Sequence, residues 1–388
     1  MERIVIIGGG GAGAALAHDL VMRGFSVTLI EKGNLFSGTT GRHHGLLHSG
    51  ARYAVNDPSA ARECIEENRI LRKIVPGALE QNGGLFVAVD DKDMAYAPLF
   101  AEGCAACGIP IRKISPGDAL SCEVNLVKSL RFAYIVPDAV MDAWRLPLHF
   151  AATARLNGAV ISEFTETVGI DVHAGSVNGV RLFDRFRHKE YVLPGDIVVN
   201  AAGAWAGRVA SLAGLVVPLR PAPGVMVSIN ARLTNMVINR LHGASEGDIV
   251  VPQRRLSILG TTLRLADDPD DTEVRAEDVK KIVEQCAEMI PAIKTQSVHA
   301  AWSAARPLID DPKASNAQAI SRTFDCFDHE GDGVNGLITL IGGKATTLRA
   351  MAEKTADLIC RKTGRDVHCT TREIVLSDYR NTFRREAP

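Results

Sequence analysis

The sequence predicts an α/β protein in which one domain is built on a parallel sheet and the other is mostly antiparallel α+β. The first observation is a run of four apolar β-branched residues at 4–7, followed by glycines, which is typical of a fully buried strand in a parallel sheet. The second is that the segments 196–203 and 337–341 repeat the pattern of a buried strand, small residues and then a helix. The third is a change after Pro218, where short strands alternate with turns. We therefore expect the parallel strands to be split along the chain, with an antiparallel unit inserted between them.

The turn after the first strand has the spacing G-x-G-x-x-G, formed by Gly8, Gly10 and Gly13. The first glycine permits a tight turn, the second lets the backbone approach a pyrophosphate, and the third lets the next helix pack closely on the strand. That helix is expected over 14–23, and its N-terminus would turn free N–H groups and a positive dipole end toward phosphates. The segment therefore predicts a dinucleotide site.

An acidic residue completes this unit. The second strand is expected over 25–30, and Glu31 stands at its end, where a carboxylate can accept hydrogen bonds from both ribose hydroxyls of an adenosine. Glu31 disfavours NADP because it would repel the 2′-phosphate, but it does not separate NAD from FAD.

Length and composition set further bounds. A chain of 388 residues is long enough for two domains, and a net charge of −1 gives no bulk field that would attract nucleic acid. The first strand begins at residue 3, which leaves no room for a signal peptide, and no apolar run approaches the roughly 20 residues of a membrane span. We expect a cytoplasmic protein, with peripheral contact at the inner face of the membrane left open.

The eight cysteines do not indicate a metal site. They are scattered, and the one C-x-x-C pair, Cys104 and Cys107, falls in an expected helix over 97–107. A redox or metal role would need a second pair or a different setting. We expect reduced cysteines and no bound metal.

Other elements follow from periodicity and capping. Asp57 is a plausible N-cap for a helix over 58–74 that has Pro58 at its first position. Further expected elements are strands at 84–89, 130–136, 224–229, 248–252 and 256–261, a hairpin at 179–193, and helices at 138–156, 204–212, 276–289 and 346–361.

The segment 41–53 combines three histidines and two arginines with small residues. A neutral imidazole such as that of His48 can take a hydroxyl proton near pH 7, and Arg52 suits an anionic substrate. The alternative is a surface loop with solvated charges.

Two later positions carry charge beside apparent strand ends. Arg306 stands before a proline, where it could form a structural ion pair or bind a ligand. Gly342-Gly343-Lys344 departs from the Walker pattern because Ile338 replaces the first glycine. It is better interpreted as a helix N-terminus that could stabilise a reduced flavin, with Lys344 either reaching a phosphate or solvated.

Together these segments resemble the FAD-dependent glycerol-3-phosphate dehydrogenases of the D-amino-acid-oxidase-like flavoprotein superfamily. The run 40–55 is especially similar to the anaerobic A-subunit branch, as are 200–203, 237–240, 305–308 and 342–349. The matches extend from the N-terminus to about Leu376, which is nearly the whole chain.

The resemblance implies non-covalent FAD and two domains. The Rossmann-like FAD-binding domain is discontinuous and would comprise residues 1–80, 140–215 and 330–388, while the substrate domain would comprise 81–139 and 216–329. The cofactor-binding residues implied by position are Gly8, Gly10, Gly11, Ala12, Gly13, Glu31, Lys32, Thr39, Thr40, Gly41, Leu46, His48, Ala202, Gly203, Trp205, Gly343, Lys344, Ala345, Thr346 and Thr347. The substrate-binding residues would be Arg52, Tyr53, Arg306 and Lys344, and the catalytic set would be His48, Arg306 and Lys344.

The implied reaction is oxidation of sn-glycerol 3-phosphate, or a close polyol phosphate, to a ketone such as dihydroxyacetone phosphate. Hydride would pass to the flavin N5, with His48 assumed as the base. One alternative is a 2-hydroxy-acid or amino-acid dehydrogenase or oxidase of the same superfamily, in which Arg306 would bind a carboxylate. Another is a flavoprotein subunit without catalysis of its own.

Two departures from the family pattern bear on partners and substrate. The A-subunit branch usually continues into a cysteine-rich module, whereas here Cys360 and Cys369 alone lie near the end, so we expect no iron–sulfur cluster. The electron acceptor, a partner subunit or a quinone, is therefore left open. Leu348 stands where the family usually has tyrosine, which could alter the substrate. The arginines of the tail 380–385 could face a membrane surface or solvent.

Overall fold

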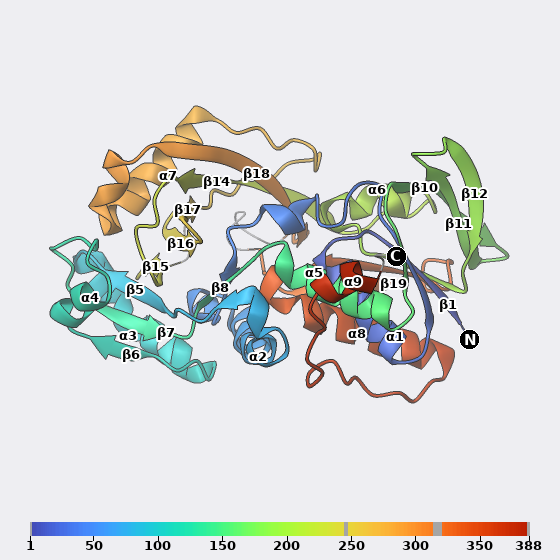
Figure 1. Ribbon diagram of the computed structural model, residues 1–388, viewed down its shortest axis with the longest axis horizontal. Helices are drawn as coiled ribbons and strands as arrows, with labels where there is room; N and C mark the ends of the chain where they lie inside the picture. The colour runs from blue at the N-terminus through green and yellow to red at the C-terminus, as the bar shows by residue number, and fades with distance from the viewer. Residues whose placement is uncertain (1, 244–246, 313–319, 386–388) are drawn as a thin grey trace.

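The computed structural model describes residues 2–243, 247–312 and 320–385, and it arranges them around two large sheets (Figure 1). The sheet on the right of Figure 1 has the strand order β19-β20-β13-β1-β2-β9. All neighbouring strands in it are parallel except the edge pair β19 and β20. Its strands are β1 (Arg3–Ile7), β2 (Ser26–Ile30), β9 (Val160–Ser162), β13 (Ile197–Asn200), β19 (Phe324–Asp328) and β20 (Leu337–Gly342).

Both faces of this parallel sheet are covered, which explains its continuous apolar strands. On one face, Ile4 and Ile6 of β1 pack in a cluster with helices α1 (Gly11–Met22), α5 (Arg145–Leu156) and α8 (Leu348–Thr363). On the other face, Val5 and Ile7 pack against a three-stranded antiparallel sheet. That sheet consists of β10 (Thr165–His173), β11 (Ser176–Asp184) and β12 (Lys189–Pro194), and it contains the expected hairpin.

The second large sheet fills the left of Figure 1 and is antiparallel except for one parallel pair, β15 with β5. Helix α7 (Ala276–Met289) packs on one face of it through a shared apolar cluster. Its strands are, in spatial order, β18 (Val298–Ile309), β14 (Leu219–Ile229), β17 (Leu256–Gly260), β16 (Ile249–Gln253), β15 (Val237–Arg240), β5 (Gly84–Ala88), β7 (Phe132–Val136) and β6 (Arg112–Ile114). The helices α3 (Asp91–Ala106) and α4 (Pro116–Cys122) belong to this half, and α2 (Pro58–Ile74) lies between the two sheets in Figure 1.

The predicted helix over 138–156 is wrong in its first third. Ala139–Met141 forms the strand β8, which pairs with β3 (Leu46–Leu47) on one side and β4 (Leu79–Glu80) on the other. The helix starts later because the Asp142 side chain accepts the N–H groups of Trp144 and Arg145, so α5 begins at Arg145. Long-range strand pairing here overrides local helix preference.

Two other boundaries differ from expectation. Helix α3 begins six residues before the expected Ala97, because Asp90 and Asp93 form a capping box. The strand β19 pairs with β20 in the parallel sheet, whereas the substrate-domain range set from the sequence runs to 329 and includes it. It has two aspartates among its five residues, and charged side chains are typical of an edge strand.

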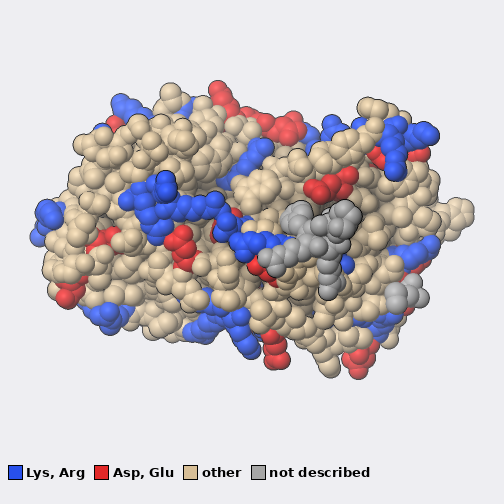
Figure 2. Space-filling model, viewed as in Figure 1, with Lys and Arg blue, Asp and Glu red and all other residues tan. Residues whose placement is uncertain are grey.

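Figure 2 shows acidic and basic side chains interspersed over this face, apart from a short basic strip near its centre. Within the described part of the chain, no helix is long and apolar enough to cross a membrane. The helix α9 (Arg380–Arg385) lies at the C-terminal end beside α5, and Tyr379 next to it packs edge-on against His149 of α5 at 5.3 Å between ring centres.

Candidate functional site

A cavity of about 1440 Å³ runs from the carboxyl end of the parallel sheet into the space between the two sheets. Its first part lies where the chain leaves β1 for β2 on one side and β13 lies on the other, which is the usual ligand position in open α/β sheets. Ordinary ligand pockets measure about 300–1,000 Å³, so this one has room for more than a small molecule.

Glycines shape the wall of this first part. Gly8 has φ +113°, and a Cβ placed there would lie 2.6 Å from the carbonyl oxygen of Ala201. A Cβ on Gly13 would lie 2.0 Å from the carbonyl oxygen of Gly8, so the close packing of α1 on β1 requires glycine there. Helix α1 starts after Gly10 with no side-chain cap and no acid in its first turn. The cradle therefore leaves the helix N-terminus open to a phosphate.

Glu31 faces the cavity just after β2. Its two carboxylate oxygens accept the backbone N–H groups of Gly9 and Gly33, each at 2.8 Å, which holds the side chain in place. Because a carboxylate offers about four acceptor positions, two remain for a ribose diol. Beyond it the Lys32 ammonium lies 5.4 Å from the centre of the Trp205 ring. The arrangement fits the adenosine half of a dinucleotide.

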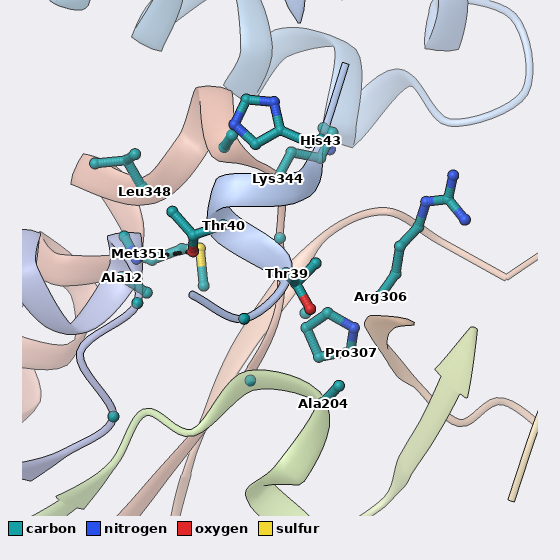
Figure 3. Close-up of a pocket in the computed structure, with 18 of the residues that line it drawn as sticks. Ala12, Thr39, Thr40, His43, Ala204, Arg306, Pro307, Lys344, Leu348 and Met351 are labelled. Atoms are coloured by element: carbon teal, nitrogen blue, oxygen red, sulfur yellow. Dashed lines mark hydrogen bonds between the residues drawn. The ribbon is translucent and has the colours of Figure 1, made fainter. Parts of the chain in front are cut away.

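The turn Thr39–Arg42 joins this end of the cavity to the other. The hydroxyl of Thr40 accepts the N–H of Gly11 at 2.9 Å, and the hydroxyl of Thr39 donates to the carbonyl oxygen of Ala305 at 2.6 Å. Figure 3 shows Thr40 beside Ala12, Leu348 and Met351, with Thr39 next to Pro307 and the Arg306 guanidinium pointing away from this group. The turn therefore touches both the first turn of α1 and strand β18.

Three histidines line the middle of the cavity. The Nδ1 atoms of His43 and His44 accept the N–H groups of Gly45 and Leu46, so in this hydrogen-bond pattern the ring proton of each sits on Nε2. Burial lowers the pKa of His43 to about 4 and that of His44 to about 3. For His48, burial first and then the charges of His44, Lys344 and Arg52 hold the pKa well below 6.5. All three imidazoles are therefore neutral at pH 7.

The three cations expected from the sequence, Arg52, Arg306 and Lys344, line the same cavity but have different partners. Arg52 pairs with the buried carboxylate of Asp248. Arg306 donates to the hydroxyl of Thr261 and, at 3.3 Å, to the carbonyl oxygen of Ala222.

Lys344 takes a third arrangement. Its ammonium donates to the carbonyl oxygen of Arg322 at 2.7 Å and lies 4.9 Å from the centre of the Tyr53 ring.

Arg322 is a fourth cation, and sequence reasoning missed it. It lines the cavity, and its buried Nη1 has no hydrogen-bond partner among the described residues. Burial lowers its pKa, and the positive charge of Arg52 lowers it further, although Tyr53 and Asp57 act in the opposite sense. Neither Arg322 nor Lys344 forms an ion pair with a carboxylate in the described ranges. A single arginine between a serine and a threonine gives no sequence signal.

Most of the sequence-predicted site residues do line this one cavity. The exceptions are Gly13, Gly41 and Thr347: Gly13 packs under Gly8, a Cβ on Gly41 would meet the Trp144 ring at 2.6 Å, and the buried Thr347 hydroxyl accepts the N–H of Lys344. The residues that line it are Gly8, Gly10, Gly11, Ala12, Glu31, Lys32, Thr39, Thr40, Leu46, His48, Arg52, Tyr53, Ala202, Gly203, Trp205, Arg306, Gly343, Lys344, Ala345 and Thr346.

A smaller cleft of about 460 Å³ lies on the other side of His43 and His44, which line both spaces. Its other walls include Trp144, Trp302 and Tyr379. All eight cysteines are free, and among the residues described no three His, Cys, Asp or Glu side chains are grouped to hold a metal ion.

This cavity belongs to a known class of flavoenzyme. The family model for FAD-dependent oxidoreductases (DAO) matches residues 3–349, so the chain belongs to that family and is an oxidoreductase with FAD as its cofactor. The glycine cradle and the open first turn of α1 fit that cofactor.

Two relatives show which members of the family this chain resembles. The chain is 39% identical to the A1-subunit of the anaerobic glycerol-3-phosphate dehydrogenase of Haloferax volcanii, over 99% of this chain and 69% of that protein. It is 38% identical to the A-subunit of the corresponding Escherichia coli enzyme, over 96% of this chain and 69% of that one. The resemblance stated from the sequence is thereby confirmed.

Solved structures show the same fold at lower identity. The glycerol-3-phosphate dehydrogenase of Bacillus halodurans, in complex with FAD, has a TM-score of 0.74 at 23% identity and covers 97% of this chain and 68% of its own. The L-proline dehydrogenase of P. horikoshii has a TM-score of 0.76 at 23% identity, over 99% and 98%. The Rossmann-type fold class predicted from the sequence is confirmed.

Proposed function

We propose that this enzyme oxidises sn-glycerol 3-phosphate, or a closely similar polyol phosphate, to the corresponding ketone, which for glycerol 3-phosphate is dihydroxyacetone phosphate. The observation that carries the proposal is the pair Lys344 and Arg322, two cations that form no ion pair with a carboxylate in the described ranges, at the end of the cavity away from the glycine cradle. A phosphate dianion supplies the negative charge that two such side chains require. The names of the two relatives from Haloferax volcanii and Escherichia coli support the same substrate.

The two ends of the cavity would then have separate tasks. The cradle at Gly8–Gly13, Glu31 and the turn at Thr39–Thr40 would hold the nucleotide part of FAD without a covalent bond, and Gly343–Thr346 would lie against its ring. FAD, when bound, supplies the acceptor for the two electrons and the hydrogen that leave the substrate carbon. Lys344 and Arg322, with Tyr53 beside them and Arg306 from another wall of the same cavity, would hold the phosphate.

His48 is the proposed acceptor for the proton of the substrate hydroxyl. Its imidazole is neutral because it is buried near Lys344 and Arg52, so it is able to take a proton at pH 7. The same surroundings make it a weak base in the ligand-free cavity. A bound phosphate dianion would raise its pKa toward neutrality, because an opposite charge nearby favours the protonated ring. His48 would therefore become an effective base when the substrate is present.

Anaerobic bleaching of the FAD-loaded protein by a panel of donors tests the proposal. The panel contains sn-glycerol 3-phosphate, other polyol phosphates, lactate, 2-hydroxyglutarate and glycine. Bleaching by glycerol 3-phosphate that is lost in Arg306→Ala is the expected result. Bleaching by a hydroxy acid or amino acid alone would overturn the proposal and assign Arg306 to a carboxylate, and a flavin that no donor bleaches would favour a non-catalytic subunit.

We also propose that electrons leave toward a separate acceptor, a partner subunit or a quinone, by way of the smaller cleft. Among the described residues, only His43 and His44 line both spaces, and aromatic side chains suit a flat ring or an apolar partner surface. Trp144→Ala is expected to slow reoxidation of the reduced protein by a soluble quinone while leaving bleaching by substrate unchanged. Equal reoxidation rates in both proteins would exclude this route.

A further inference from the structure

Asp57 joins two parts of the chain that are far apart in sequence. One carboxylate oxygen accepts the N–H of Ala60 at 3.1 Å and caps α2, as the sequence predicts. The other accepts the N–H of Arg322 and the hydroxyl of Ser321, both at 2.9 Å. The side chain is half-buried and lines the cavity. It therefore fixes the backbone of the residue that carries the fourth cation.

The connection continues to the second cation. The carbonyl oxygen of Arg322 accepts the Lys344 ammonium at 2.7 Å, and the carbonyl oxygen of Thr323 accepts the N–H of Gly343 at 3.0 Å. The start of α2, the segment 321–323 and the turn at 343–344 thus form one hydrogen-bonded unit. Displacing the segment 321–323 would move both cations at once.

The charge of Asp57 is unfavourable for the site that it lines, because a carboxylate repels an anionic ligand. The number of acceptor atoms in its carboxylate explains why an aspartate suits position 57. Three donors, from Ala60, Ser321 and Arg322, point at Asp57, and a carboxylate has two acceptor oxygens that can be divided between the helix and the segment. An asparagine offers one acceptor oxygen, and its NH₂ group would face donors.

We propose that Asp57 is a positioning residue that builds the phosphate-binding corner by holding Arg322 and, through it, Lys344. The inference rests on the proposed function in one respect, namely that the anion bound there is the phosphate of the substrate. Asp57 does not itself contact that phosphate. Asp57 therefore affects the affinity for the anion. Binding of the cofactor and the limiting rate of oxidation depend on other residues.

Asp57→Asn separates the two tasks of this side chain. Asparagine caps a helix as well as aspartate does, so the melting temperature should change by no more than a few degrees. We expect the affinity of the FAD-loaded protein for inorganic phosphate, measured by calorimetry, to fall about tenfold or more. The concentration of glycerol 3-phosphate that half-saturates bleaching should rise by a similar factor, while the limiting rate stays within about threefold. Asp57→Ser, which also caps but is too short to reach Arg322, should behave alike.

Asp90→Asn is the matched control. Asp90 is likewise a helix N-cap, for α3, and likewise holds an arginine, Arg240, at 2.8 Å, but it does not line the cavity. Phosphate affinity should be unchanged in that variant. If wild type and Asp57→Asn bind phosphate equally well, the positioning role is overturned and the proposed function stands. If wild-type protein binds no phosphate and is not bleached by glycerol 3-phosphate, both fail together.

Discussion

The two ends of the cavity are built by different means. The nucleotide end is formed mainly by the backbone of one continuous stretch, β1, the glycine turn and α1, closed by Glu31 at the end of β2. The anion end is formed by side chains from four separate places: Arg52 and Tyr53, Arg306, Arg322, and Lys344. The nucleotide end depends on the absence of side chains, since a Cβ at Gly8 or Gly13 would collide with backbone atoms. The second depends on charges brought together by the fold.

Substitutions at the two ends should therefore impair different functions. A substitution in the backbone cradle should remove the cofactor, because nothing in that wall can move aside easily. A substitution at the anion end should leave the cofactor bound and lower the affinity for the anion, because side-chain charges can be removed without disturbing the main chain.

Gly8→Ala should yield protein without bound FAD. Alanine at φ +113° is strained, and its Cβ would lie 2.6 Å from the carbonyl oxygen of Ala201. The flavin absorbance of purified protein is the measurement. Gly207→Ala is the control, because a Cβ there meets nothing closer than 3.8 Å, and it should retain the cofactor. A Gly8→Ala protein with a full complement of FAD would contradict the backbone account of this end.

Lys344→Met should keep FAD but raise the concentration of glycerol 3-phosphate needed for half-maximal bleaching by about 10- to 100-fold. The reason is the loss of a charge-assisted hydrogen bond to the phosphate, on the order of 1.5–3 kcal/mol. Lys32→Met, which removes a lysine at the opposite end beside Trp205, is the matched control and should leave this concentration unchanged. An equal rise in this concentration in both variants would contradict the assignment of separate tasks to the two ends.

Stability should fall as pH drops from about 6.5 toward 4. Burial lowers the pKa of His18 and His43 to about 4 and that of His44 to about 3, with His48 also well below 6.5. Because the unfolded chain binds these protons near pH 6.5, it holds more protons than the folded protein in this window, so acid favours unfolding. Each histidine contributes up to about 1.4 kcal/mol per pH unit. Urea unfolding at several pH values measures this slope.

The pH dependence also separates the two ends. Saturating phosphate should shift the loss of stability to lower pH, because an anion near His48 makes its protonation in the folded state easier. His18, which lies on α1, should not respond. An unfolding profile that is flat between pH 6.5 and 4 would show that these histidines are not held neutral.

His18→Leu should stabilise the protein by about 1 kcal/mol at pH 7, and by more at pH 5. Both ring nitrogens of His18 are buried without a hydrogen-bond partner in the described part of the chain, so the change removes an uncompensated polar burial. Denaturant unfolding measures the gain. His173→Leu, at an exposed position, should show no comparable gain. Lower stability in His18→Leu would mean that the imidazole has a polar partner.

Sequence alone predicts the nucleotide end well because its signals are local. The spacing of Gly8, Gly10 and Gly13 and the acid at 31 lie within one strand–turn–helix–strand unit, and the bounds of α2 follow from the Asp57 cap and Pro58. The helix expected at 138–156 fails in part because β8 is stabilised by strands 60 to 95 residues away. Local propensity cannot register such pairing.

The anion end could be predicted only in part. Arg52, Arg306 and Lys344 follow from the resemblance, and the structure places all three in the cavity. Arg322 could not be found this way, because its position depends on hydrogen bonds to Asp57, 265 residues earlier in the chain. The neutral state of the histidines likewise depends on burial in the folded chain.

The most direct test of the account is anaerobic rapid mixing of glycerol 3-phosphate with FAD-loaded wild-type protein and with the double variant Arg322→Met/Lys344→Met. The account predicts that both proteins contain FAD, that wild type is bleached with saturation, and that the double variant reaches the same extent only at concentrations at least about 100-fold higher. Equal half-saturating concentrations in the two proteins would contradict it, because the phosphate would then be held elsewhere.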